Sequence, residues 1–128
     1  MSKFLNYYIT PIIIAVLIII FSSIPGNQYP ELEAGGYDYS NITNTIAHLI
    51  EFALLAFFTL RAFNQSKMTR GYKVLISLVL LVLFAITDEY HQAYAPGREV
   101  SFIDLLFDSL GILTGLGLYM RRENWRLK

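Results

Sequence analysis

The stretch "TDEYHQAYAPGREVSFIDLLFDSLG", residues 87–111, places six charged side chains and a histidine in a chain that is otherwise largely aliphatic. The chain has 128 residues, of which 55% are hydrophobic and only 16% are charged. Roughly a quarter of the residues of a soluble domain are charged, so this composition favours a membrane protein. The charges in residues 87–111 then need a reason of their own, because ionised side chains are costly in lipid.

Four apolar segments are long enough to cross a membrane as helices, since a hydrocarbon core of about 30 Å needs about 20 residues. The first is too long for the apolar region of a signal peptide, which has roughly 7–15 residues, so we expect it to be retained. The sequence therefore predicts an all-α fold, an integral membrane four-helix bundle formed by residues 1–128 as a single domain. The four spans are expected at approximately residues 4–22, 44–63, 72–93 and 101–120.

The basic residues predict the orientation of this bundle. Nine of the ten Lys and Arg residues fall at the N-terminus, between the second and third spans, or in the C-terminal tail. Short loops rich in these residues stay in the cytoplasm. We therefore expect both termini in the cytoplasm, and residues 23–43 and 94–100 outside. Residues 87–111 would then lie in the outer half of the membrane.

Helical periodicity predicts which polar residues share a face. In the third span, Asp88, His91 and Gln92 are three and four residues apart and should lie side by side, whereas Glu89 points about 100° away. In the second span, His48 and Glu51 are three residues apart on one face. Both faces are expected at a similar depth, within two turns of the outer ends of their helices.

The fourth span carries one continuous stripe of polar and small residues. Ser101, Asp104, Asp108, Gly111 and Gly115 follow one another at spacings of three and four. A Gly-x-x-x-Gly pair lets two helices approach closely in lipid, so the stripe should face a neighbouring helix, in this chain or by self-association. The two aspartates would then face inward. Three spans thus direct acids and histidines to one place.

Two interpretations of this cluster remain open. The residues could be hydrogen-bonding glue between helices, or they could form a functional pocket. Shared faces on three spans favour the pocket. Residues at the headgroup level have a third reading as solvated side chains, which applies to Glu89, Arg98 and Glu99.

The charge balance also favours a function. Six carboxylates stand against Arg98 and two histidines, so either some acids hold protons or a cation is bound among them. Carboxylate and imidazole without thiolate suit Zn, Mn or Fe, or Mg and Ca through oxygen alone, so a divalent metal cofactor stays open. No HExxH motif is present. The candidate metal ligands are Glu51, His48, Glu89 and His91.

Acid–base or metal-assisted chemistry fits these residues better than nucleophilic catalysis. The chain has no cysteine, and no Ser or Thr forms an evident triad with a histidine and an acid. The sequence lacks a pervasive basic surface, so nucleic acid is not expected as a partner. The expected catalytic residues are Asp88, Glu89, His91, Asp104, Glu51 and His48, and the expected binding residues are Arg98, Gln92, Ser101 and Asp108.

The segment "DEYHQAYAPGREVSFIDLLFDSLGILTG" resembles the D-E-x-x-Q, P-G-R, S-x-x-D and G-x-x-x-G run of the VanZ-like membrane proteins. "SSIP" after the first span and "IAHLIEF" in the second resemble further elements of that family. Two positions depart from the pattern: Thr45-Ile46 stand where a basic residue commonly precedes the family histidine, and Asp108 stands where Asn is common. The second departure adds an acid to the cluster.

The resemblance implies a multi-pass protein of the bacterial cytoplasmic membrane. The family takes its name from a member that confers resistance to teicoplanin, a glycopeptide that binds cell-wall precursors outside the membrane. Its partner would then be a membrane lipid or a lipid-linked cell-wall precursor. Three functions stay open: an enzyme acting on a headgroup, a non-catalytic binder of lipid or antibiotic or a structural scaffold, and, less favoured, a proton or cation transporter. The inner halves of the spans lack the ionisable residues that transport needs.

Overall fold

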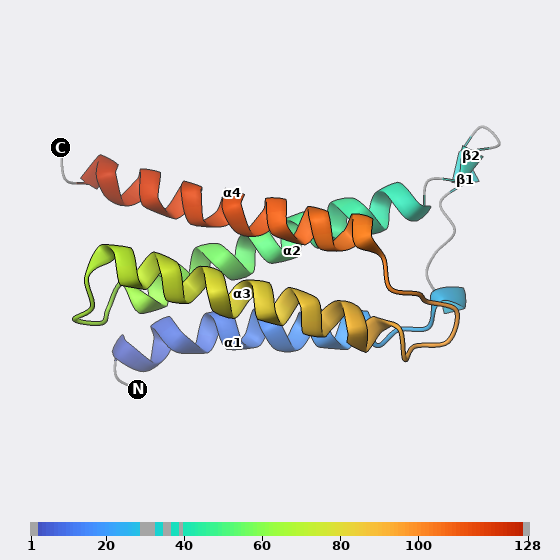
Figure 1. The fold of residues 1–128 in the computed structure, drawn as a ribbon, viewed down its shortest axis with the longest axis horizontal. Coiled ribbons are helices and arrows are strands. Elements are labelled where there is room, and N and C mark those ends of the chain that lie inside the picture. Colours follow the sequence, from blue (N-terminus) through green and yellow to red (C-terminus); the bar gives the residue numbers. More distant parts are fainter. Residues whose placement is uncertain (1–2, 29–32, 35–36, 39, 127–128) are drawn as a thin grey trace.

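The computed structural model describes residues 3–28, 33–34, 37–38 and 40–126, and it confirms the predicted bundle of four helices (Figure 1). The helices are α1 (Lys3–Ser22), α2 (Ser40–Phe63), α3 (Arg70–Gln92) and α4 (Phe102–Arg126). A 3-10 turn, η1 (Gly26–Gln28), and two antiparallel two-residue strands, β1 (Glu33–Ala34) and β2 (Tyr37–Asp38), lie between α1 and α2. Residues 29–32, 35–36 and 39 of the predicted loop and Lys128 of the basic tail lie outside the described residues.

All four helices are long and apolar enough to cross a membrane. α4 continues to Arg126, past the predicted end of the span, because Arg and Glu favour a helix and no Gly or Pro interrupts residues 121–126. The outward faces carry many exposed Leu and Ile side chains, which suits contact with lipid. The candidate spans are Leu5–Ser22, Ile42–Phe63, Arg70–Gln92 and Phe102–Glu123.

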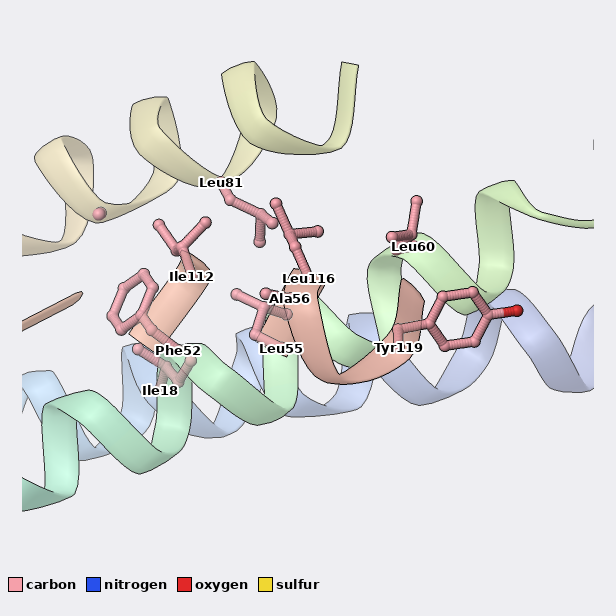
Figure 2. Close-up of a cluster of buried hydrophobic side chains, with 10 residues drawn as sticks. Ile18, Phe52, Leu55, Ala56, Leu60, Leu81, Ile112, Leu116 and Tyr119 are labelled. Carbon is pink, nitrogen blue, oxygen red and sulfur yellow. The ribbon is translucent and has the colours of Figure 1, made fainter. Parts of the chain in front are cut away.

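Every helix contributes to one apolar core (Figure 2). In lipid, close packing of side chains holds helices together, because apolar surface gains little by leaving acyl chains. An edge-to-face contact between the rings of Phe57 and Tyr119, with centroids 5.3 Å apart, extends this packing towards the end of α4. The buried core residues are Ile18, Phe52, Leu55, Ala56, Leu60, Leu81, Ala85, Ile112, Leu116 and Tyr119.

The glycine stripe of α4 packs against α2, as the sequence predicts. A methyl group added at Gly111 would lie 2.5 Å from the carbonyl oxygen of Leu49. One added at Gly115 would overlap the carbonyl of Ala53 and lie 2.9 Å from the Cβ atom of Ala56. The absence of side chains at these two positions therefore sets the closest approach of α2 and α4.

The two ends of the bundle differ in charge. The start of α1, the end of α4 and the α2–α3 loop lie at one end, and the α1–α2 and α3–α4 connections lie at the other (Figure 1). We call these the terminal end and the connection end. Arg61 marks the terminal end, where its guanidinium lies 4.8 Å from the centroid of the Tyr7 ring. Arg61, Lys67, Arg70, Lys73, Arg121 and Arg122 all belong to helices or loops at this end.

Candidate functional site

Buried polar side chains gather at the connection end of the bundle. Eight polar or charged side chains are buried among the described residues, and seven of them form one group, which we call the polar cluster; the eighth, Ser77, lies midway along the apolar part of α3. All four helices contribute to the polar cluster. Its members are Ser22 of α1, His48 of α2, Asp88, Glu89 and Gln92 of α3, and Asp104 and Asp108 of α4.

A histidine–aspartate pair joins α2 to α4. Nδ1 of His48 lies 2.8 Å from Oδ1 of Asp108, and the two residues are 4% and 0% exposed. With Asp108 as the acceptor, His48 donates its Nδ1–H and keeps a lone pair on Nε2. The pair therefore holds the imidazole ring in one orientation, with Nε2 directed at α3.

Gln92 closes the other side of this imidazole. Its Nε2 atom lies 3.3 Å from Nε2 of His48, 3.1 Å from Oδ2 of Asp88 and 3.4 Å from Oγ of Ser22. Ser22 in turn donates a hydrogen bond of 2.7 Å to Oδ1 of Asp88. Because the amide has two hydrogens for three acceptors, one contact is left without a proton at any moment. Gln92 therefore occupies the hydrogen-bonding position at Nε2 of His48.

Arg98 sets the orientation of the Gln92 amide. Its guanidinium donates a hydrogen bond of 2.6 Å to Oε1 of Gln92, which leaves the NH₂ group facing His48. The same guanidinium nitrogen lies 3.5 Å from Oδ1 of Asn44, and Asn44 donates to Oδ2 of Asp104 at 3.4 Å. A chain of hydrogen bonds thus leads from Arg98 in the α3–α4 turn through Gln92 to the imidazole of His48.

The backbone of the α3–α4 turn carries Arg98 to this position. Arg98 donates its N–H to the carbonyl of Ala95 at 3.1 Å, and Gly97 has a φ of 76°. Proline followed by a glycine with positive φ is typical of a type II turn. Gly26 of the α1–α2 connection donates its N–H to the carbonyl of Pro96 at 2.9 Å, so the two connections are tied together beside the polar cluster.

Glu89 and Ser101 form the boundary between α3 and α4. Oγ of Ser101 accepts the backbone N–H of Asp104 at 3.1 Å, which makes Ser101 the N-cap of α4. The backbone N–H of Ser101 donates to Oε1 of Glu89 in a short hydrogen bond. In a capping box the third helical residue accepts this N–H, but here a carboxylate from the preceding helix does so. Glu89 and Asp104 also lie close to the positive end of the α4 dipole.

The predicted face of α3 is wrong in one respect. Asp88 and Gln92 are buried as expected, but His91 is exposed and contacts the exposed Ser23, with 2.9 Å between its Nε2 and the serine Oγ. Glu89 is buried in its place. The inward face of α3 is centred between Asp88 and Glu89, because it continues the buried line of Leu81 and Ala85.

The remaining site residues lie at the edge of the cluster. Asp104 and Asp108 face inward as predicted, at 9% and 0% exposure. Glu51 and Arg98 are half-buried, and Glu99 is exposed in the turn, which fits its reading as a solvated residue. The structure thus brings together His48, Asp88, Glu89, Gln92, Asp104 and Asp108, with Arg98 beside them.

The four candidate metal ligands do not converge. His91 points outward, Glu89 accepts the N–H of Ser101, and His48 is bonded to Asp108. Within the described residues no three His, Asp or Glu side chains are placed so that they could hold a metal ion. The prediction fails for His91 because that side chain lies on the outward face of α3.

Sequence reasoning missed Ser22 and Asn44 as members of this hydrogen-bonded network. Asn44 lies four residues before His48, on the same helical face, so the periodicity that linked His48 to Glu51 also predicts Asn44. Ser22 gives a weaker signal, because a serine at the end of an apolar helix is common as a local backbone contact. Its role depends on α1 lying against α3, which helical periodicity does not reveal.

Two carboxylate oxygens of the polar cluster are buried without a partner. Oδ2 of Asp108 and Oε2 of Glu89 accept no hydrogen bond from the part of the chain that the structure describes. A buried acceptor left unpaired costs about 1–3 kcal/mol, and more if it is charged. Protonation does not remove this cost, because the oxygen then becomes a donor that still lacks a partner. The two atoms therefore mark places where a donor group would be stabilised.

Four apolar helices with a buried polar site at one end define a multi-pass membrane protein. The VanZ/LLP1 family matches residues 7–125, so the chain belongs to this family, as its motifs indicated. No curated protein and no solved structure matches the chain.

Proposed function

We propose that this protein binds the headgroup of a membrane lipid or of a lipid-linked cell-envelope precursor at the outer face of the bacterial cytoplasmic membrane. The observation that carries the proposal is the gathering of buried ionisable side chains from α2, α3 and α4 at the connection end. A charged group within a span costs about 2.5–3.5 kcal/mol on insertion scales, and such groups usually mark function. Structural glue alone does not require five ionisable residues at one place.

The surroundings of the polar cluster support contact with the headgroup layer. Tyr90, Tyr94 and Phe102 are exposed at the connection end, where aromatic side chains are typical of the membrane–water interface. The excess of Lys and Arg at the terminal end predicts that this end is cytoplasmic, so the connection end would face outward. Lipid-linked wall precursors and glycopeptide antibiotics meet on that side.

Transport is less favoured. Towards the terminal end the core consists of apolar side chains such as Leu55, Leu60 and Leu116. Among the described residues, the buried acids and histidines stop at the polar cluster. The phenol of Tyr119 is the one other buried titratable group in that part of the chain, so no relay of acids and bases continues through the bundle. A polar site confined to one end of the bundle fits binding better than passage.

The Asp108–His48 pair favours a second candidate, an enzyme that acts on the bound headgroup by acid–base catalysis. A carboxylate that orients an imidazole is the usual arrangement of a general base. Displacement of Gln92 would expose Nε2 of His48 to a substrate. Conversion of a labelled headgroup by purified wild-type protein, lost in His48→Asn, would favour the enzyme, and binding without conversion would favour the binder.

The proposal is tested by separating function from folding. The variants His48→Ala and Asp104→Asn are expressed in the native host, and teicoplanin tolerance is measured beside membrane abundance. We expect tolerance to fall by more than membrane abundance does, although His48→Ala also costs some stability because Oδ1 of Asp108 loses its donor. His91→Ala, on the exposed face of α3, is the matched control and should change neither. If tolerance falls only in proportion to abundance at each position, the polar cluster is structural.

A further inference from the structure

We propose that the group received by the polar cluster is a primary ammonium, supplied by the headgroup of an aminophospholipid such as phosphatidylethanolamine. This inference rests on the proposed headgroup site and names its chemical preference. The phosphate and the amine of such a lipid carry opposite charges, and we assign the amine, not the phosphate, to the polar cluster.

The sign of the charge in the polar cluster favours a cation. Asp88, Glu89, Asp104 and Asp108 are buried together, and Glu51 is half-buried one helical turn below His48. The guanidinium of Arg98 is held by Gln92 and Asn44. A phosphate would therefore enter a group of carboxylates, and like charges in a site of low dielectric repel strongly. An ammonium ion reduces this repulsion.

The unpartnered oxygens independently indicate a hydrogen-bond donor. Oδ2 of Asp108 and Oε2 of Glu89 are acceptors, while their sister oxygens already bind His48 and the backbone of Ser101. A primary ammonium has three N–H donors and a positive charge. A quaternary choline has the charge but no N–H, and a sugar hydroxyl has the donor but no charge. Of these groups, the ammonium satisfies both observations.

The depth of the site matches a headgroup that bends into the protein. Asp108 is six residues into α4 and Glu89 is three residues from the end of α3, so both lie within about 10 Å of the ends of their helices. Asp104, at 9% exposure, is the most exposed acid of the buried group and lies in the first turn of α4. An amine attached to a phosphate at the interface would pass Asp104 to reach the more deeply buried acids of the polar cluster.

The test compares two lipids that differ in the amine alone. Purified full-length protein in detergent is titrated with phosphatidylethanolamine or phosphatidylcholine of identical acyl chains, and binding is measured by native mass spectrometry. We expect phosphatidylethanolamine to bind at least about tenfold more tightly. Asp108→Asn and Glu89→Gln should each reduce this preference, whereas Glu99→Gln, at an exposed acid of the adjacent turn, should preserve it. The melting temperature without lipid verifies that each variant is folded.

The outcomes separate this inference from the proposed function. Equal affinity for the two lipids, with both lost in His48→Ala, leaves the headgroup site intact and overturns the ammonium assignment. Tighter binding of phosphatidylglycerol also overturns it. Lipid binding that no cluster variant changes removes both proposals.

Competition by free ethanolamine at the affinity of the lipid would support the ammonium and identify a soluble amine as its source, whereas weak competition identifies the lipid. If Asp108→Asn does not fold, Glu89→Gln and the wild-type comparison decide the result.

Discussion

At the scale of single residues, Gln92 has the largest role in ordering the polar cluster. It connects Arg98 to His48, and it also donates to Asp88. Reversal of its amide would turn the NH₂ group towards the Arg98 guanidinium, where two donors would face each other. The guanidinium therefore determines which atom of Gln92 meets the imidazole, while Asp108 accepts the proton on Nδ1 of His48.

Removal of the Gln92 amide should destabilise the protein. Gln92→Ala leaves Oδ2 of Asp88 and Nε2 of His48 without a donor, so we expect the free energy of unfolding to fall by about 1–3 kcal/mol. Denaturant unfolding monitored by circular dichroism measures this change. His91→Ala is the control on the neighbouring, exposed position and should change stability by less than about 0.5 kcal/mol. Equal losses in the two variants would contradict the assigned network.

The residue-level predictions from sequence depended on where each helical face is centred. Asp104 and Asp108 were placed correctly because Gly111 and Gly115 mark the same stripe and bury it against α2. For α3 the sequence offers no such marker, since Asp88 is three residues from His91 and one from Glu89. The choice between His91 and Glu89 depends on contact with the start of α4, through Ser101, and that contact is a property of the folded bundle.

At the scale of elements, the α2–α4 contact depends on two glycines. Gly115→Leu places a branched side chain on the carbonyl of Ala53, so we expect α4 to move away from α2 and the melting temperature in detergent to fall clearly. The matched control is Gly117→Ala, at a position where an added methyl group meets nothing within 4 Å. Alanine is the better helix former by up to about 1 kcal/mol, so this control should be neutral or stabilising.

An unchanged melting temperature in Gly115→Leu would mean that this face of α4 looks towards lipid. A loss in Gly117→Ala as large as that in Gly115→Leu would mean that both variants act through the helix itself. Either result would contradict the packing of α2 on α4.

The start of α4 depends on its cap. Ser101→Ala removes the acceptor for the backbone N–H of Asp104, and the loss of such a cap costs about 0.5–2 kcal/mol. Ser101→Thr retains the hydroxyl and should restore most of this stability. Thermal unfolding of the two variants measures the difference. If threonine is as destabilising as alanine, the hydroxyl does not act as a cap.

Element boundaries were predictable where hydropathy changes abruptly and unpredictable elsewhere. The end of the third span was expected near Ala93, and α3 ends at Gln92, because the Pro96-Gly97 turn follows closely. The extension of α4 to Arg126 was missed, since hydropathy reports where a helix leaves lipid and not where it stops. The hairpin of β1 and β2 has strands of two residues, which are too short for an alternating pattern to be recognised.

At the scale of the whole molecule, polarity is divided along the bundle. The polar cluster lies at the connection end, the apolar core continues towards the terminal end, and most of the basic residues follow there. This division fits a site that lies near one face of the membrane. The ligand that the cluster can meet also depends on the orientation of the bundle in the membrane, because the two leaflets and the two aqueous sides offer different headgroups and partners.

The most direct test of the central claim, that the polar cluster lies at the outer face of the membrane, is the labelling of single cysteines in intact cells. The chain has no cysteine of its own, so Gln28→Cys at the connection end and Lys67→Cys at the terminal end provide clean reporters, and both positions are exposed. A membrane-impermeant maleimide should label Gln28→Cys in intact cells and Lys67→Cys only after the membrane is opened, because loops rich in Lys and Arg stay in the cytoplasm. Labelling of Lys67→Cys but not of Gln28→Cys in intact cells would place the polar cluster at the cytoplasmic face and contradict the account.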